Sequence, residues 1–449
     1  MSTATSPRPG PASWGDRVRD LWRPTAADRG RLIACVLIAL LASIVTGKDG
    51  SGDHPLHGIN WSLTHHGLYY AIGGVVLWVG AVLGRSLAPA MRGARSQVSS
   101  VTDRALRPRW ARPLLYLVLL GIAIWYPRTI SAAGQQSLVN DVAIYALLGL
   151  GLNVVVGFAG LLDLGYIAFY AIGAYTTAYF TSKTAIPWHA PFVWNPFFIF
   201  PIAVIVAALA GVLLGGPTLR LRGDYLAIVT LGFGEIVYLL ANNEKGITNG
   251  ASGAFGVPQL SIHLGSFKYK WGLASLPYYY LLLGIIVVVM MAFSALNRSR
   301  TGRALAAIRE DEVAAEAMGV PTLKYKLIAF AIGASVSGFA GVIFATEQFF
   351  DPSSFTFQAS ILVLTIVIFG GMGSVFGVVL GAIVLQGLLY NLKDTVPPND
   401  RYIYFGAVIM LMMVFRPQGL LPSRRRSREL ALSEAGIGHA DATMSGSAS

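Results

Sequence analysis

The stretch FFIFPIAVIVAALAGVLLGG, residues 197–216, is twenty residues long and contains no charged or polar side chain. A helix of roughly twenty apolar residues crosses the hydrocarbon core of a bilayer. The chain of 449 residues shows the same bias, because 54% of its residues are hydrophobic and only 12% are charged. That charged share is about half of the roughly 25% found in soluble domains. The composition argues against a soluble fold and predicts an all-α integral membrane protein.

Similar apolar stretches follow one another along most of the chain. Candidate spans lie at residues 32–46, 68–84, 113–130, 141–160, 162–182, 197–216, 224–241, 277–297, 324–345, 357–372, 375–391 and 402–415. Several are shorter than the roughly 20 residues that a straight span needs. The stretches at 162–182, 224–241 and 357–372 contain glycines, so we expect some of these helices to be broken or re-entrant. The prediction is a polytopic protein with roughly ten to twelve transmembrane helices.

The basic residues predict the orientation of the spans. The net charge is +12, and arginine and lysine cluster between the apolar stretches, at residues 17–31, 92–112, 220–222, 298–326 and 416–428. Cytoplasmic loops carry the excess of these residues, and a path of twelve spans with both termini cytoplasmic places every cluster on that side. The basic residues form no single face, so no nucleic-acid partner is expected.

Some kinds of chemistry are not expected from the sequence. Cys35 is the single cysteine, which excludes a disulfide within the chain, and the seven histidines show no metal-ligand spacing. We therefore expect no metal site and no cofactor. The sequence lacks the phosphate-binding motif GxxxxGK[ST] and the hydrolase motifs HExxH and GxSxG. The chain is therefore expected to be neither an ATPase nor another enzyme.

One long cytoplasmic loop carries a candidate functional segment. Residues 297–324 read NRSRTGRALAAIREDEVAAEAMGVPTLK. Residues 304–318 lack Pro and Gly and repeat apolar side chains near the helical period, which predicts one short amphipathic helix at the membrane surface. Such a helix could simply connect two spans or could dock into a partner. Its charged run REDE at residues 309–312, followed by Glu316, suits a protein partner better than an anionic leaflet.

The same loop carries a family resemblance. Ala314, Ala315 and Gly319 fit the A-A-x-x-x-G part of the pattern E-A-A-x-x-x-G found in bacterial ABC importer permeases, although Val313 replaces the glutamate and Glu312 stands one residue too early. The longer stretch GRALAAIREDEVAAEAMGV resembles the branched-chain amino acid permeases of the Liv type. Further similar stretches follow the family order: GLNVVVGFAGLLDLGYIAFYAIGAY at 151–175, PTLRLRGDYLAIVTLGFGEIV at 217–237, FGGMGSVFGVVLGA at 369–382 and RPQGLLP at 416–422. The resemblance covers residues 140–422 and is specific to the M-type permease subunit.

Composition and the resemblance together predict a domain organisation. The polar composition predicts a cytoplasmic arm at residues 1–31 and a disordered cytoplasmic tail at 423–449. The resemblance implies an ABC importer permease domain at 131–422, which leaves accessory spans with a basic cytoplasmic loop at 32–130. Within the permease domain, residues 298–324 would form the cytoplasmic coupling loop. The implied location is a bacterial cytoplasmic membrane.

The resemblance also implies a function and partners. The implied activity is ATP-driven import of leucine, isoleucine and valine by alternating access. The implied partners are a second related permease subunit, two ATP-binding cassette ATPase subunits and an extracytoplasmic substrate-binding protein. Movement of the coupling loop would rearrange the helices around residues 151–175 and the turn at 370–373.

Candidate site residues fall in two groups. The resemblance implies that ATPase coupling involves Gly302, Arg303, Arg309, Glu310, Asp311, Glu312, Glu316 and Gly319. Candidates for the translocation path are Asn153, Gly157, Gly160, Asp163, Gly165 and Glu235, because they are glycines in apolar helices or polar groups near membrane depth.

Each path candidate also has a structural interpretation. The glycines are expected to serve close helix packing. Asp163 could cap a broken helix at the path, but the topology favours a turn at the cytoplasmic end. An ionised Glu235 facing lipid would be costly, so it should face protein or water, as a gate group or as a hydrogen-bond partner of another subunit.

Other functions remain open from the sequence. A urea or short-chain amide permease has similar glycine-rich stretches. A secondary transporter driven by an ion gradient would need a central ion site, for which Asp163 and Glu235 are the available carboxylates. A membrane scaffold is disfavoured by the coupling-like loop.

Overall fold

The computed structural model describes residues 120–219, 224–264, 267–272 and 274–392, together with positions 406, 410, 412 and 419–421. Several predictions lie outside these residues: the cytoplasmic arm, the spans at 32–46 and 68–84, most of the spans at 113–130 and 402–415, and the tail. The described residues from Ala123 onward belong to one compact unit.

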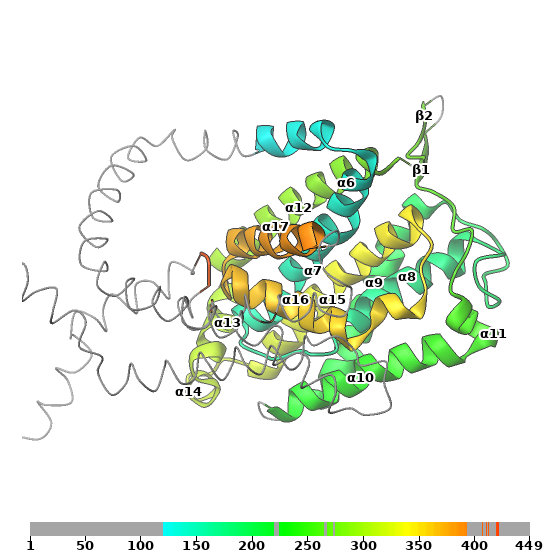
Figure 1. The fold of residues 1–449 in the computed structure, drawn as a ribbon. Helices are drawn as coiled ribbons and strands as arrows, with labels where there is room; N and C mark the ends of the chain where they lie inside the picture. Colours follow the sequence, from blue (N-terminus) through cyan, green and yellow to red (C-terminus); the bar gives the residue numbers. More distant parts are fainter. Residues whose placement is uncertain are drawn as a thin grey trace, which may run out of the picture. The chain divides into compact units, whose positions relative to one another are not determined.

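The described unit is built almost entirely of helices (Figure 1). A short 3₁₀ helix, η1 (Tyr126–Thr129), precedes a continuous helical stretch, Ala132–Phe158, made of α6 (Ala132–Ser137), the π-helix η2 (Leu138–Ala143), α7 (Ile144–Leu152) and the π-helix η3 (Asn153–Phe158). The remaining helices are α8 (Ile167–Thr181), α9 (Pro196–Thr218), α10 (Asp224–Asn243), α11 (Lys245–Thr248), η4 (Gly250–Ser252), α12 (Ser275–Arg298), α13 (Arg300–Glu310), α14 (Glu312–Ala317), α15 (Thr322–Glu347), η5 (Pro352–Phe355), α16 (Phe357–Gly370) and α17 (Val375–Leu392).

Among the described residues, five helices are long and apolar enough to cross a membrane. They are Ala132–Phe158, Pro196–Thr218, Tyr225–Asn243, Ser275–Arg298 and Thr322–Glu347. Two shorter apolar helices, Phe357–Gly370 and Val375–Tyr390, follow them. The predicted all-α membrane fold is confirmed, whereas the total of ten to twelve spans stays a prediction because the N-terminal candidates lie outside the described residues.

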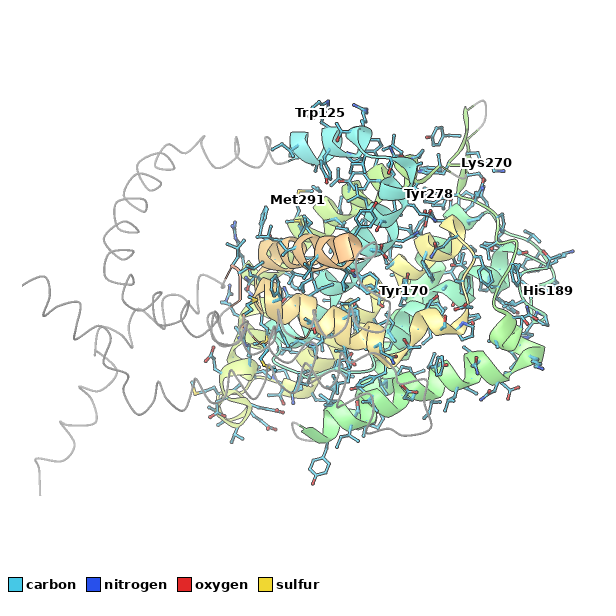
Figure 2. The ribbon with its side chains drawn as sticks, viewed as in Figure 1. Trp125, Tyr170, His189, Lys270, Tyr278 and Met291 are labelled. Carbon is cyan, nitrogen blue, oxygen red and sulfur yellow. The ribbon has the colours of Figure 1, made fainter. Side chains whose placement is uncertain are left out.

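Two of the long helices form the centre of the unit. The most apolar stretch of Ala132–Phe158 is 83% buried, and that of α15 is 61% buried. The corresponding stretches of the outer helices are much less buried, with 22% in α9, 22% in α10 and 17% in α12. The central α15 packs against α9, α8 and α7. The outer helices present apolar residues at the edge of the bundle, as Met291 on α12 does at 60% exposure (Figure 2). Such a surface suits lipid or another membrane subunit.

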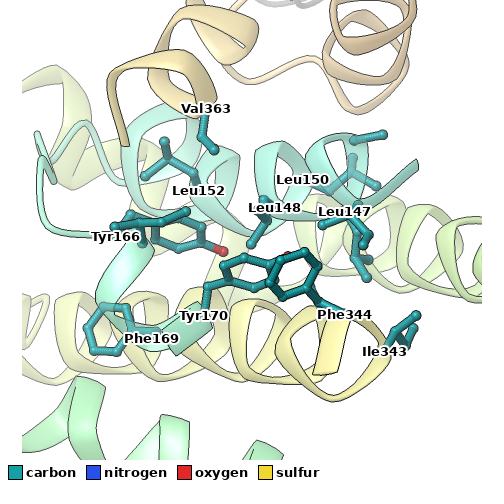
Figure 3. Close-up of a cluster of buried hydrophobic side chains, with 14 of the residues drawn as sticks. Leu147, Leu148, Leu150, Leu152, Tyr166, Phe169, Tyr170, Ile343, Phe344 and Val363 are labelled. Atoms are coloured by element: carbon teal, nitrogen blue, oxygen red, sulfur yellow. The ribbon is translucent and has the colours of Figure 1, made fainter. Parts of the chain in front are cut away.

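Aromatic rings and glycines bring the central helices together. The rings of Tyr170 on α8 and Phe344 on α15 lie 5.1 Å apart among the leucines of α7 (Figure 3). A Cβ atom at Gly173 would lie 2.2 Å from the carbonyl oxygen of Gly338, so only glycine allows this close approach of α8 and α15. The glycines of this crossing therefore serve packing.

A hairpin that the sequence analysis did not predict lies between α11 and α12. Strands β1 (Ser261–Leu264) and β2 (Phe267–Lys270) pair antiparallel, with Ser261 opposite Lys270. Both strands alternate polar and apolar residues, which is the period of a strand. Tyr278 holds the segment before the hairpin, because its hydroxyl accepts from the nitrogen of Leu260 at 3.2 Å and donates to the carbonyl of Thr346 at 3.0 Å (Figure 2).

Candidate functional site

The coupling segment, residues 299–320, contains α13 and α14. Its first turn is fixed by Ser299, whose hydroxyl oxygen accepts a hydrogen bond from the nitrogen of Gly302 at 3.2 Å. A Cβ atom at Gly302 would lie 2.2 Å from the carbonyl oxygen of Leu296. Gly302 therefore allows the tight connection from α12 into α13, and it is buried, so it is not part of the exposed surface of the segment.

The prediction of one helix over residues 304–318 is wrong, because the structure divides this stretch at Asp311. Asp311 is extended, with φ −155° and ψ 111°. Its Oδ1 atom accepts hydrogen bonds from the nitrogens of Val313 at 2.9 Å and Ala314 at 3.0 Å. These bonds satisfy the free donors at the start of a new helix, so Asp311 caps α14.

The second helix of the segment ends at a glycine that the conformation requires. Gly319 has φ +83°, which side-chain-bearing residues rarely adopt. Its nitrogen donates to the carbonyl of Glu316 at 2.9 Å, and the nitrogen of Val320 donates to the carbonyl of Ala315 at 3.0 Å. This is the Schellman pattern that closes a helix through a left-handed glycine.

The coupling segment has one buried face and one exposed acidic face. Leu305, Ile308 and Ala315 are buried against the unit. The exposed predicted coupling residues are Arg303, Glu310, Asp311, Glu312, Glu316 and Gly319. Two apolar side chains lie among them, Val313 at 69% exposure and Met318 at 84%. Carboxylates around exposed apolar side chains form a surface suited to contact with another protein.

Arg309 points in the other direction, toward the membrane helices. Its Nη1 atom donates to the carbonyl oxygen of Gly157, at the end of η3, over 2.5 Å. Gly160, with φ +74°, lies against the stem of the same side chain, since a Cβ atom there would be 2.9 Å from Arg309 Cγ. The structure thus brings Gly157 and Gly160, which were predicted for the translocation path, into contact with Arg309, which was predicted for ATPase coupling.

Asn153 connects the same helix end to a distant turn. The side chain is fully buried, and its Oδ1 atom accepts from the nitrogen of Gly373 at 2.8 Å. A Cβ atom at Gly157 would lie 2.0 Å from Asn153 Oδ1 and 2.5 Å from the Gly373 nitrogen. Gly157 therefore leaves the room in which η3 and the turn between α16 and α17 meet.

Lys326 forms a second link between the coupling segment and the helices. Its Nζ atom lies 2.5 Å from Glu312 Oε1, where α14 begins. The lysine side chain is only 4% exposed and the glutamate is 46% exposed. Lys326 was not predicted as a site residue, because a lysine in the first turn of a predicted span is typical of an ordinary membrane anchor.

Asp163 lies in the non-helical linker between η3 and α8, where the structure gives it a turn. It is 1% exposed, and its Oδ1 atom accepts from the nitrogen of Gly165 at 3.0 Å. The linker packs on α10, because the backbone nitrogen of Leu164 donates to the hydroxyl of Thr230 at 3.1 Å. The approach is so close that a Cβ atom at Gly165 would lie 1.8 Å from the Thr230 carbonyl oxygen. Thr230 is a partner that the sequence analysis missed.

Glu235 lies on a different face of α10. The same side of the helix carries Ile228, seven residues before Glu235, Gly232, three residues before it, and Leu239, four residues after it. Ile228 is 65% exposed, Leu239 is 49% exposed, and nothing lies within 4 Å of a Cβ atom built at Gly232. Glu235 itself is half-buried, and its carboxyl group has no hydrogen bond or ion pair with another described residue. The structure therefore does not bring it together with Asp163.

A polar cluster that was not predicted from the sequence lies on the two central helices, toward the ends that are remote from the coupling segment. Asn140 Nδ2 donates to Gln348 Oε1 at 2.9 Å, and Ser275 Oγ donates to Glu347 Oε1 at 3.2 Å. These bonds join the first third of the span Ala132–Phe158, the start of α12 and the end of α15. Among the described residues, no group of His, Cys, Asp and Glu could hold a metal ion.

Comparisons with known proteins agree with one another. The pattern of the family described as branched-chain amino acid transport system / permease component matches residues 136–416. The chain is 41% identical over 343 residues to the high-affinity branched-chain amino acid transport system permease protein LivM of Salmonella typhimurium, covering 72% of this chain and 78% of that protein. It is 42% identical over 338 residues to LivM of Escherichia coli K12, covering 71% and 76%.

A second type of permease is also similar, more distantly. LivH of Escherichia coli K12, a high-affinity branched-chain amino acid transport system permease protein, is 28% identical over 141 residues, covering 30% of this chain and 45% of that protein. No solved structure matched the chain.

Proposed function

The chain belongs to the permease family of branched-chain amino acid transport systems, and from this premise we propose that it is a membrane subunit of an ABC importer for leucine, isoleucine and valine. The observation that carries the proposal is the identity of 41% over 343 residues with a permease of that name. The matched family region, residues 136–416, contains the coupling segment, α10 and the central helices. The protein is a multi-pass membrane protein.

The energy for transport comes from partner subunits in this proposal. Two ATPase subunits serve the complex, and one of them docks on the exposed face of the coupling segment, which carries Glu310 and Glu316 together with Val313 and Met318. Exposed apolar side chains among charges support a protein contact at this face. The coupling segment and both termini lie on the cytoplasmic side of a bacterial membrane, and a substrate-binding protein delivers the amino acid on the other side.

A second, related permease subunit completes the path. The similarity of the chain to both LivM and LivH supports a pair of related permeases. The face of α10 that carries Glu235 meets this second subunit or the water-filled path beside it. Both environments could supply a hydrogen-bond donor for Glu235, whereas lipid could not.

Uptake by whole cells tests the substrate and the energy source together. Radiolabelled leucine and urea are supplied to cells with and without the gene, and each assay is repeated after ATP depletion with the ion gradients preserved. We expect deletion to abolish an ATP-dependent component of leucine uptake and to leave urea uptake unchanged. Loss of urea uptake instead would select an amide permease, and gene-dependent uptake that survives ATP depletion would contradict the ABC assignment.

A further inference from the structure

Two basic side chains connect the coupling segment to the membrane helices. Arg309 reaches from α13 to the carbonyl oxygen of Gly157, and Lys326 reaches from α15 to the carboxylate of Glu312 on α14. Neither side chain contributes to the exposed face of the segment, since Arg309 is half-buried and Lys326 is buried. Both therefore act toward the membrane core and away from the surface where an ATPase would dock.

The Arg309 bond satisfies a carbonyl group that the helix end leaves free. The last carbonyls of a helix have no partner within it. At the end of η3, the carbonyl of Val154 accepts from Ala159 at 3.2 Å, and the carbonyl of Val155 accepts from Leu161 at 3.1 Å. The carbonyl of Gly157 accepts from the guanidinium of Arg309. A cation is favourable at this end because the helix dipole is negative there.

The neighbouring glycines make this contact rigid. Gly160 packs against the Arg309 stem, so the side chain is held both at its charged end and along its length. Gly157 sits directly over Asn153, which binds the nitrogen of Gly373. A displacement of Arg309 therefore reaches η3 and, through Asn153, the turn between α16 and α17.

The ion pair of Lys326 makes a second attachment. Separating α14 from α15 would leave an ammonium group of a side chain that is 4% exposed without its partner carboxylate. Removing one member of a buried ion pair is strongly destabilising, although the 46% exposure of Glu312 reduces the effect here. The segment is thus held to the span Ala132–Phe158 by Arg309 and to α15 by Lys326.

We propose that Arg309 and Lys326 are positioning residues that fasten the coupling segment to the membrane core, so that a push on the segment moves η3 and α15 together. The proposal rests on the proposed function, because the push would come from the ATPase subunits. It gives Arg309, one of the residues assigned to ATPase coupling from the sequence, a specific role in that coupling. Variants that lose either attachment hydrolyse ATP without moving the core.

The ion pair is tested by charge reversal in the complete complex with its partner subunits in proteoliposomes. The measured quantity is the number of ATP molecules hydrolysed per leucine transported. We expect Glu312→Lys and Lys326→Glu each to raise this ratio about fivefold or more, since coupling between two sites typically has an effect of at least that size. The double variant restores the pair and should return the ratio close to that of the unmodified complex. Lys324→Glu, an exposed lysine two residues away, is the matched control and should leave the ratio unchanged.

Arg309 is tested by removing its donor while keeping its stem. Arg309→Met should raise the number of ATP molecules hydrolysed per leucine transported. Arg309→Lys keeps a donor group and the positive charge, so it should raise this ratio less. Arg300→Met removes an exposed arginine at the start of α13 and serves as the matched control. If Arg309→Met and Lys326→Glu assemble and keep the normal ratio, the proposal is wrong. A double charge reversal that couples no better than either single variant also overturns the ion-pair attachment.

A second measurement does not depend on the transported substrate. Hydrogen exchange at the amides of Ala159 and Leu161 reports the stability of the η3 end, to which Arg309 is fastened. We expect faster exchange in Arg309→Met than in the unmodified complex, and equal exchange would contradict the attachment. An unmodified complex that does not transport leucine would instead contradict the proposed function and leave this exchange result valid.

Discussion

The Oδ1 atom of Asn153 lies 2.8 Å from the backbone nitrogen of Gly373, a residue 220 positions away in the sequence. This bond joins the end of the first long helix to the turn between two short apolar helices. Because Gly157 also contacts Arg309, a continuous chain of contacts runs from the coupling segment into the membrane core. The contacts lie in the region expected to move during transport.

Asn153→Ala should destabilise the protein by leaving the buried amide of Gly373 without an acceptor. An unsatisfied buried group costs about 1–3 kcal/mol. Thermal unfolding of the purified protein in detergent measures the effect as a lowered midpoint temperature. Asn243→Ala, which changes an exposed asparagine at the end of α10, should have little effect. Equal midpoints for the two variants would contradict the role of the Asn153 bond.

Gly165→Ala should separate the linker before α8 from α10. The added methyl group would lie 1.8 Å from the carbonyl oxygen of Thr230, so the backbone must shift, at a cost of about 1–3 kcal/mol or more. We expect a lower yield of folded protein and a lower unfolding midpoint. Gly232→Ala has nothing within 4 Å of the new atom and should be neutral or slightly stabilising. A loss of equal size in both variants would show that packing at Gly165 is not the cause.

Gly319→Val should loosen the end of α14 and impair coupling. Its φ of +83° costs a side-chain-bearing residue about 1–2 kcal/mol, and valine is among the least suited residues. ATP hydrolysis should continue while leucine uptake falls. Gly319→Asn should be much milder, because asparagine tolerates the left-handed conformation. Normal uptake per ATP in Gly319→Val would contradict a coupling role for this helix end.

Glu235→Leu should reduce leucine uptake, whereas Glu235→Gln, which keeps the hydrogen-bonding geometry, should retain most of it. The reason is that this carboxyl group on an apolar face of α10 has no partner among the described residues, so we expect it to bond to a second subunit or to water in the path. Co-purification of the second permease, measured alongside uptake, separates these roles, because loss of a subunit bond of about 1–3 kcal/mol would also weaken assembly. Full uptake and assembly by Glu235→Leu would remove Glu235 from the site.

The apolar pattern was sufficient to predict most of the described spans. The prediction at residues 197–216 corresponds to α9 (Pro196–Thr218), and the prediction at 324–345 corresponds to α15 (Thr322–Glu347). The span predicted at 141–160 begins earlier, at Ala132, because its polar first turns are stabilised by contacts such as that of Asn140 with Gln348. A partner 208 positions away leaves no local pattern in the sequence.

The coupling segment shows a different limit of sequence reasoning. Its apolar period predicted one amphipathic helix at the membrane surface, but this period gave no reason to end a helix at Asp311, which has no Gly or Pro beside it. The break depends on one side chain accepting two backbone hydrogen bonds. Arg309 was assigned to ATPase coupling, but its contact with Gly157 was not predicted, because the sequence indicates the charge of a long side chain and does not indicate its direction.

Leucine uptake by the purified complex in proteoliposomes tests the central claim most directly. The complex contains this chain, the second permease and the ATPase subunits, and it is supplied with the binding protein and radiolabelled leucine. The proposed function predicts uptake that requires ATP on the ATPase side and continues after ionophores collapse every ion gradient. Uptake without ATP that follows an imposed ion gradient would contradict it and would identify a secondary transporter.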